Sequence, residues 1–426
     1  MTIHIRGARV IDPKNKRDAR QDLFIDRGVI AAVGKAPAGF SAERTIEAAG
    51  LVAMPGLVDL SARLREPGFE YKATLESEMQ AAVAGGVTSL VCPPDTDPPL
   101  DEPGLVEMLK YRARSLNLAH VYPLGALTAK LGGERLTEMA VLRDAGCVGF
   151  SQADVPLADT HLVWRAMQYA ATYGFCVWLR PQDGPLAKGG VAHDGQVASR
   201  LGLQGIPAFA ETIALGAILQ LVRATGTRVH FCRLSTAEGV HMVREAKRER
   251  LPVSADVSAH HVHLSDMDIG YFDSHCHLVP PLRSLRDRDA LRQGLADGAI
   301  DAICSDHTPV DEDAKMIPFA ESEAGATGLE LLLPLTLKWA AEASLPLPDA
   351  LARVTSNPAR VLGIDAGHLA PGAAADLCLF DPDAQVLIAA ETLKSQGKNT
   401  PFIGYELPGK VRYTLVGGKV VHQSDA

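Results

Sequence analysis

The stretch "LVAMPGLVDLSARLREPG", residues 51–68, contains an apolar strand candidate that ends in polar and charged side chains. Similar strand candidates follow it, and amphipathic helical stretches such as "LESEMQAAVAGG" separate most of them. The strand candidates are residues 56–64, 87–94, 119–127, 147–152, 176–181, 228–235, 252–261 and 301–306. Eight strand–helix repeats over roughly 300 residues predict an α/β fold, a (β/α)8 TIM barrel whose chemistry lies at the carboxyl ends of its strands.

The two ends of the chain follow another pattern, in which short alternating strands are separated by turns. Neither end is long enough to cover a sheet of its own. We therefore expect residues 1–53 and 360–426 to meet in one small composite β-sandwich. Residues 54–359 would then form the barrel domain.

Composition excludes several classes of function. The net charge of −9 argues against nucleic-acid or anionic-membrane partners. No stretch approaches the roughly 18 apolar residues of a spanning helix, and the alternating "MTIHIRGARVID" lacks a signal-peptide pattern, so a cytoplasmic location is expected. The seven cysteines contain no C-x-x-C pair, which favours buried free thiols over a zinc finger or disulfide framework.

Several short motifs occur in a fixed order along almost the whole chain. They are "PGLVDL…LREPG", "YKATLES", "AAVAGGVTSLVCPP", "RLSTAEGV", "VPPLR", "DAICSDHTP" and "GATGLE", with "ADLCLFDP" and "NTPFIGYELPGKVRYTLVGGKVV" near the C-terminus. In this order the motifs resemble those of dihydroorotases of the amidohydrolase superfamily. The resemblance implies a barrel with a β-sandwich, and a role in pyrimidine biosynthesis.

The resemblance also implies a zinc centre at the barrel mouth of active members. Its ligands are a His-x-His pair on the first strand, an acidic residue or carboxylated lysine on the fourth, one histidine each on the fifth and sixth, and an aspartate on the eighth. Imidazoles and carboxylates donate lone pairs to the metal, which lowers the pKa of bound water. The aspartate then acts as the base.

In this chain most of these ligand positions carry other residues. The lost positions are Ser61, Arg63, Gln152, Arg180 and Arg233, and only Asp306, at the position of the base, is kept. Arginine has no lone pair to offer and stays protonated, so no cofactor is expected. Zinc belongs only to the alternative that the protein is active. His230, three residues before Arg233, is expected to point the other way along its strand.

Three guanidinium groups would therefore stand where a divalent cation belongs. Two unit charges ~4 Å apart at an effective dielectric of ~20 interact by about 4 kcal/mol, and a divalent ion doubles this for each arginine. We expect Arg63, Arg180 and Arg233 to fill the metal's space as a plug with Asp306 as counter-ion. A second interpretation adds Arg65 and makes an anion site for phosphate, sulfate or a small carboxylate. The plug is favoured, although one carboxylate alone would leave charge uncompensated.

The substrate-binding positions are altered as well. Arg65 of "REPG" is kept, and the resemblance implies that it grips the substrate carboxylate. Asp95 stands where an amide is expected and would repel an anionic substrate. Val279 and Val310 replace an asparagine and a histidine, and His307 is expected to be a hydrogen-bond partner rather than a ligand. We interpret Arg65, Asp95 and His307 as a vestigial substrate pocket.

Two groups of histidines leave a replacement metal site open. They are His260, His261 and His263 in one segment, and His275 and His277 in another. Imidazoles two residues apart share a strand face and could bind one metal ion. We favour buried or surface histidines without a ligand role, and His275 and His277 deserve the closer inspection because their loop should pass near the barrel mouth.

The overall pattern is similar to the inactive dihydroorotase homologues that some bacteria pair with aspartate transcarbamoylase. This resemblance implies a non-catalytic subunit that supports assembly and activity of the transcarbamoylase catalytic chain, as a homo-oligomer, a dimer, within the complex. The alternative is an active dihydroorotase, or a related cyclic-amide hydrolase, with a displaced or reduced metal site. Such an enzyme would convert dihydroorotate to N-carbamoyl-aspartate.

Overall fold

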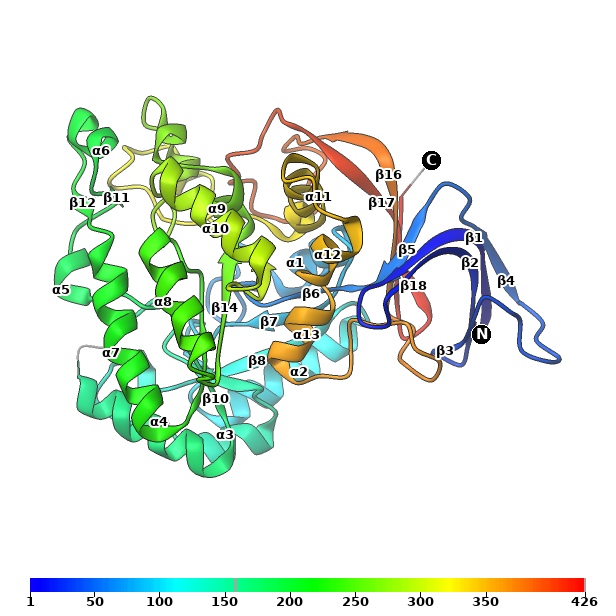
Figure 1. The fold of residues 1–426 in the computed structure, drawn as a ribbon, viewed down its shortest axis with the longest axis horizontal. Coiled ribbons are helices and arrows are strands. Elements are labelled where there is room, and N and C mark those ends of the chain that lie inside the picture. The colour runs from blue at the N-terminus through cyan, green and yellow to red at the C-terminus, as the bar shows by residue number, and fades with distance from the viewer. Residues whose placement is uncertain (157–158, 425–426) are drawn as a thin grey trace.

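A barrel of eight parallel strands lies at the centre of the molecule in the computed structural model, which describes residues 1–156 and 159–424 (Figure 1). In the order of their hydrogen bonding the strands are β6 (Leu57–Asp59), β7 (Val87–Cys92), β8 (His120–Ala126), β9 (Gly149–Ser151), β10 (Cys176–Leu179), β13 (Arg228–Phe231), β14 (Val253–Ser258) and β15 (Ala302–Cys304). Each lies inside one of the eight stretches predicted from the sequence. The predicted α/β TIM-barrel fold is confirmed.

The first and last strands close the barrel just beyond their carboxyl ends. The backbone N–H of Arg63 donates to the carbonyl of His307 at 2.8 Å, and the N–H of His307 donates to the carbonyl of Ser61 at 3.1 Å. The N–H of Ser305 donates to the carboxylate of Asp59 at 2.8 Å. This seam brings the polar ends of β6 and β15 side by side at the mouth of the barrel.

Helices between the strands cover the outside of the barrel (Figure 1). They are α1 (Leu75–Ala84), α2 (Pro103–Leu116), α3 (Met139–Ala145), α4 (Thr160–Tyr173), α5 (Gly184–Ala187), α6 (Gln196–Leu201), α7 (Phe209–Thr225), α8 (Ala237–Arg248), α9 (Ala259–His263), α10 (Leu285–Asp297), α11 (Leu332–Glu342), α12 (Leu347–Ala352) and α13 (Ser356–Leu362). Shorter elements are β11 (Ala192–His193), β12 (Gly205–Ile206), η1 (Ala129–Leu131), η2 (Asp266–Ile269), η3 (Ser274–Cys276), η4 (Asp313–Lys315) and η5 (Leu329–Leu331). Across residues 1–156 and 159–424, no helix combines the length and apolar character needed to span a bilayer.

Helix α8 illustrates why these segments are helical. Thr236 caps its first turn by accepting a hydrogen bond from the backbone N–H of Gly239 at 3.0 Å. Val240, Val243 and Ala246 recur at helical spacing and are buried against the barrel. The apolar faces of such helices and the outward-facing strand residues form the largest core of the protein.

The two ends of the chain form a second sheet beside the barrel (Figure 1). Its strands are β1 (Thr2–Asp12), β2 (Arg17–Asp26), β3 (Val29–Val33), β4 (Arg44–Glu47) and β5 (Val52–Pro55) from the N-terminus, and β16 (Leu377–Leu387), β17 (Glu406–Val416) and β18 (Lys419–Gln423) from the C-terminus. Antiparallel pairing of β16 with β5 joins the two ends, as expected. The sheet also has an apolar core separate from that under the helices.

The hydrogen bonds join these strands into one continuous sheet. The reason lies in β1, whose register with β2 shifts between Ile5 and Ala8. The first half of β1 pairs with β4 and the second half with β5, so the sheet continues through this strand. Only Gly56 separates β5 from β6 of the barrel. The domain boundaries proposed above, residues 1–53 with 360–426 and residues 54–359, stay a prediction.

Candidate functional site

Three arginine side chains meet at the mouth of the barrel. Arg63 lies beyond β6, Arg180 directly follows β10, and Arg233 lies beyond β13. Their side chains are only 4–6% exposed. The structure therefore brings together the three predicted arginines in a buried setting, where each positive charge requires a partner.

One carboxylate, that of Asp154 in the segment between β9 and α4, binds all three arginines. Its oxygens lie 2.6 Å from Arg63 Nη2, 2.7 Å from Arg180 Nε and 2.5 Å from Arg233 Nη2. Burial favours the neutral acid, but the charges of Arg233, Arg63 and Arg180 hold the pKa of Asp154 well below its usual range. This geometry corrects the expectation that Asp306 is the shared counter-ion.

Two further aspartates complete the cluster. Asp95 accepts a hydrogen bond from Arg63 Nε at 2.7 Å. Asp306 accepts one from Arg233 Nη1 at 2.9 Å, while its nearest distance to Arg63 is 3.6 Å. Burial raises the pKa of Asp306, and the two arginines oppose this rise. The ion pairs join three arginines to three aspartates, so the formal charges of the cluster balance.

We call this group the arginine–aspartate cluster; its members are Arg63, Arg180, Arg233, Asp95, Asp154 and Asp306. It differs from the predicted plug in the carboxylates that neutralise the arginines. The sequence interpretation assigned one counter-ion and left positive charge that could attract an anion. Asp154 and Asp95 remove that excess within the chain itself. Arg63 also donates to the hydroxyl of Thr308 at 2.9 Å, so its three guanidinium nitrogens all have partners.

The backbone leaves the regular strand conformation at several strand ends. Arg233 and Asp306 have φ angles of 54° and 48°, in the left-handed region that side chains other than glycine rarely adopt. The alternation of side chains is therefore broken between His230 and Arg233. The ring of His230 contacts that of Trp178 at 4.3 Å between centroids and hydrogen-bonds Asp256 at 2.9 Å. His230 thus points into the barrel, and the prediction that it points the other way is wrong.

The residues predicted as a vestigial substrate pocket are each bound to other groups of the chain. Asp95 binds Arg63, as described above. Arg65 donates from Nε to the carbonyl of Pro309 at 2.8 Å, and its Nη2 lies 3.8 Å from a carboxylate oxygen of Glu323, which also pairs with Lys72. The position opposite Arg65 is therefore taken by a carboxylate of the chain itself, which the sequence analysis missed.

The ring of His307 points away from the mouth, although its backbone is part of the seam between β6 and β15. Its side chain is fully buried, its ring hydrogen-bonds the carboxylate of Glu78, and Nδ1 accepts from the backbone N–H of Gly328 at 3.1 Å. The placement of His307 in a substrate pocket is wrong because the turn after Asp306 directs its ring toward α1. The role of hydrogen-bond partner fits these contacts.

Gln152, at a position where the resemblance implies a ligand, is bound elsewhere. Its amide donates to the carbonyl of Leu131 at 2.7 Å and accepts from Thr128 at 2.9 Å. Ser61 contributes its backbone carbonyl to the seam of the barrel. None of these hydrogen bonds joins Gln152 or Ser61 to the three arginines.

The histidine groups do not form a replacement metal site. Each ring of α9 donates from Nε2 to a different carbonyl: His260 to Thr327 at 3.2 Å, His261 to Pro280 at 3.1 Å and His263 to Leu335 at 2.8 Å. His275 is partly exposed beside Asp273, whereas His277 is stacked on Phe319 and bound to Ser322. Within the described residues, no three His, Cys, Asp or Glu side chains are placed to hold a metal ion.

Zinc therefore does not fit the donors at the mouth. Asp154 binds guanidinium nitrogens through both of its oxygens, and Asp95 and Asp306 each bind one arginine through a single oxygen. A zinc ion would have to displace three cations that cannot lose their charge. The arrangement favours a closed, charge-balanced cluster over an open coordination site.

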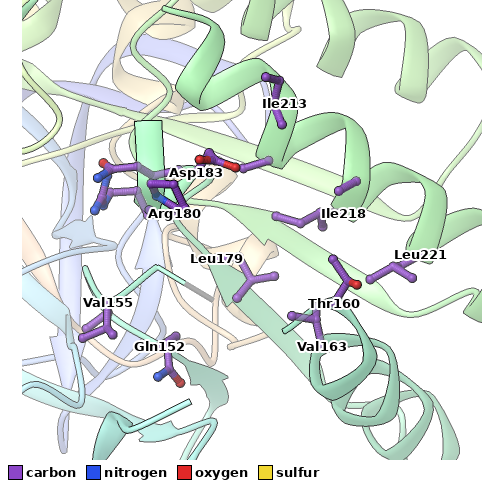
Figure 2. Close-up of a pocket in the computed structure, with 16 residues that line it drawn as sticks. Gln152, Val155, Thr160, Val163, Leu179, Arg180, Asp183, Ile213, Ile218 and Leu221 are labelled. Atoms are coloured by element: carbon purple, nitrogen blue, oxygen red, sulfur yellow. The ribbon is translucent and has the colours of Figure 1, made fainter. Parts of the chain in front are cut away.

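An apolar pocket of about 250 Å³ lies beside this cluster, between α4, β10 and α7 (Figure 2). Leu179, Val163, Ile218 and Leu221 line it, and Arg180 lies at one side. Most of the lining is aliphatic, and the pocket lies outside the barrel under the helices. Its polar lining residues other than Arg180 are Gln152, Thr160, Gln182 and Asp183.

Comparison with known proteins places the fold and the motifs in one family. The family model described as "Dihydro-orotase-like" matches residues 50–239, and that of the "Amidohydrolase family" matches residues 201–422. A "Dihydroorotase-like protein" of Pseudomonas aeruginosa is 50% identical over 423 residues, which cover 99% of this chain and 100% of that protein. The chain belongs to the dihydroorotase-like family of the amidohydrolase superfamily. The family resemblance seen in the motifs is thereby confirmed.

Other members of the dihydroorotase-like family carry the name of an enzyme. A "Dihydroorotase" of Geobacter sp. (strain M21) is 38% identical, with both chains covered over 100% of their length. Among solved structures, the L-hydantoinase (dihydropyrimidinase) of Arthrobacter aurescens superposes with a TM-score of 0.88 at 23% identity, covering 99% of this chain and 96% of that one. At that identity the structural likeness shows the fold alone.

Proposed function

We propose that this chain is a non-catalytic dihydroorotase-like subunit that supports the assembly and activity of the aspartate transcarbamoylase catalytic chain in pyrimidine biosynthesis. The observation that carries the proposal is the arginine–aspartate cluster at the mouth. Three guanidinium groups fill the space that the resemblance assigns to the metal, and Asp154 binds all of them.

The cluster has two chemical consequences. Without a metal ion, no water at the mouth is activated as a hydroxide at neutral pH. Because Asp306 is engaged with Arg233, the position of the catalytic base is also occupied by an ion pair. Asp306, Arg65, Asp95 and His307 are accordingly proposed as remnants of an enzyme site, and no cofactor is required.

The barrel and the terminal sheet supply the surfaces for assembly in this proposal. The 50% identity to a relative named "Dihydroorotase-like protein" spans the whole chain rather than a single motif, which supports a shared role of the entire fold. We propose that the chain works as a homodimer within a cytoplasmic complex with the transcarbamoylase catalytic chain.

Co-expression with the aspartate transcarbamoylase of the same organism tests the proposed role. We expect the two chains to co-elute in size-exclusion chromatography at micromolar concentration, and transcarbamoylase activity to be higher in the complex than for the catalytic chain alone. Separate elution together with unchanged activity would remove the basis for the subunit role.

An active hydrolase is the second candidate. Full-length relatives named "Dihydroorotase", at 37–40% identity, favour it, and so does the retention of Asp306 and Arg65. In that case the chain would open dihydroorotate or a related cyclic amide with a displaced or reduced metal site. Metal analysis of the purified protein, together with dihydroorotate turnover in added zinc, separates the two candidates. Stoichiometric zinc with turnover would establish the hydrolase and overturn the non-catalytic role.

A further inference from the structure

A pocket of about 690 Å³ lies at the base of the barrel, at the end opposite to the arginine–aspartate cluster. Val253, the first residue of β14, and Asp301, which precedes β15, form part of its wall, and helices α8 and α10–α13 supply the remainder. We propose that this pocket binds the phosphate group of a small metabolite.

The charged residues that line the pocket do not balance. They are three cations, Lys247, Arg353 and Arg360, and two carboxylates, Asp301 and Asp349. Asp301 serves two of the cations, because its oxygens lie 2.6 Å from Lys247 Nζ and 3.5 Å from Arg360 Nη2. It also accepts from the backbone N–H of Ala255 at 2.9 Å. The lining residues therefore carry one positive charge in excess. Both carboxylate oxygens of Asp301 already have partners within the chain.

Arg353 carries that excess. Its guanidinium makes no hydrogen bond and no ion pair with any residue in 1–156 or 159–424. Its backbone is fixed, since its carbonyl accepts from the N–H of Ile303 in β15 at 3.0 Å. Burial lowers the pKa of Arg353, and the nearby carboxylates of Asp301, Asp349 and Asp297 offset this effect only in part. A half-buried guanidinium without a bound acceptor fits a site for an anion.

A second donor in the wall is unsatisfied. The indole N–H of Trp339 is buried and has no hydrogen-bond partner among the described residues. Native proteins leave few buried donors unpaired, and such cases call for an unseen partner or a functional role. Phosphate oxygens are strong acceptors that several donors can share, whereas a single carboxylate offers only two oxygens.

The volume of the pocket indicates the size of the phosphate compound that it can bind. Its volume of about 690 Å³ exceeds the needs of a bare phosphate ion and falls within the range of small-molecule sites. Leu251, Leu295 and Leu345 also line it and provide apolar surface beside the charged groups. A phosphate monoester of nucleotide size fits this combination of a cationic point and apolar walls.

Calorimetric titration of the intact protein at constant ionic strength tests the proposal, with inorganic phosphate and AMP as probes. We expect saturable binding of at least one probe. Tighter binding of AMP would identify a larger ester, and equal binding would identify the phosphate ion as sufficient. Because a charged hydrogen bond contributes on the order of 1.5–3 kcal/mol, Arg353→Gln should weaken binding by about tenfold or more.

Two variants keep this test decisive. Arg360→Gln changes a side chain that is 69% exposed, so the fold should tolerate it, and it should also weaken binding. Arg223→Gln is the matched control, because Arg223 forms a paired surface contact with Glu249 outside the pocket and should leave binding unchanged. Absence of saturable binding for both probes overturns the proposal. Equal affinity of the wild type, Arg353→Gln and Arg360→Gln for the probes also overturns the proposal. The same holds if the Arg223→Gln control loses as much affinity as the pocket variants.

Discussion

At the scale of single residues, Asp154 has the largest influence on the barrel mouth. It binds Arg63, Arg180 and Arg233, which are 91, 26 and 79 positions away in the sequence. Replacing a buried ion pair by apolar residues is often harmless, but removing one partner leaves buried charge uncompensated. The three arginines therefore depend on this carboxylate more than on Asp306, which pairs closely only with Arg233.

The change Asp154→Asn tests this dependence. We expect the free energy of unfolding to fall by about 3 kcal/mol, the lower end of the range for breaking buried pairs, because the Asp154 side chain is 31% exposed. Urea unfolding measures this difference. Asp18→Asn is the control, since Asp18 also pairs with two nitrogens of one arginine, Arg9, but at the surface. It should cost less than about 1 kcal/mol. Equal costs would mean that Asp154 does not hold the cluster.

The arginines themselves can be exchanged for histidine, the ligand type that the resemblance implies at their positions. We expect the single changes Arg63→His, Arg180→His and Arg233→His to produce neither bound zinc nor dihydroorotate turnover. One imidazole would still face two guanidinium groups, which repel a divalent cation. Zinc content after dialysis and a turnover assay in added zinc measure the outcome. Restoration of activity by any one of the three changes would show that the cluster does not block the metal.

At the scale of elements, the ends of the strands determine which side chains share the mouth. Ala153, Arg233 and Asp306 lie in left-handed turns just after β9, β13 and β15. These turns release the chain from the strict alternation of a strand, so residues near a strand end can face the barrel in succession. The alternation of side chains along a strand therefore predicted their direction within the strands. It gave the wrong relative direction for His230 and Arg233, which are separated by the turn after β13.

The short helix α9 contains three buried histidines that couple stability to pH. Burial lowers the pKa of His263 from 6.5 to about 4. Between these values the unfolded chain binds more protons than the folded one, so the free energy of unfolding falls as the pH falls from 6.5 toward 4. One such group contributes a slope of about 1.4 kcal/mol per pH unit.

We therefore expect His263→Gln to flatten the pH dependence of stability in this window, since a glutamine amide can replace the donor to Leu335 without titrating. Urea unfolding at a series of pH values measures the slope. Above about pH 7.5, where imidazole is neutral in both states, the two proteins should show parallel curves. Parallel curves below pH 6.5 as well would contradict a role for His263 in acid sensitivity.

At the scale of the whole molecule, the barrel and the terminal sheet meet at a close contact. Gly86 precedes β7, and a Cβ atom at this position would lie 2.6 Å from the sulfur of Cys378 in β16. The hydroxyl of Thr414 in β17 also donates to the carbonyl of Val83 in α1 at 2.6 Å. The terminal sheet is thus packed directly against the first strand–helix units of the barrel.

The change Gly86→Ala probes this junction. Its φ of +81° and the contact with Cys378 both disfavour alanine, whereas Gly363 has a φ of +72° and no atom near its would-be Cβ. Both substitutions should carry the backbone cost of roughly 1–2 kcal/mol. We expect Gly86→Ala to be more destabilising than Gly363→Ala by roughly 1–3 kcal/mol, the cost of overpacking. Equal thermal and urea stabilities of the two variants would show that the contact between residue 86 and Cys378 can relax without a loss in the free energy of unfolding.

The sequence alone indicated the barrel and the joining of the two chain ends, and the loss of the metal ligands is a prediction from the resemblance of its motifs. Apolar periodicity indicated the eight strands, and the identities of Arg63, Arg180 and Arg233 excluded lone-pair donors without any knowledge of their positions. The continuity of the terminal sheet was not predictable, because it depends on the irregular register of β1.

Tertiary structure alone decided which carboxylates neutralise the arginines. Asp154 was visible in the sequence as a neighbour of Gln152, but its three ion pairs depend on distances set by closure of the barrel. The burial of His307 against Glu78 and the proximity of Glu323 to Arg65 likewise join segments hundreds of residues apart. Side-chain chemistry is local and can be read from the chain, whereas charge compensation depends on the fold that brings distant groups within a few ångströms.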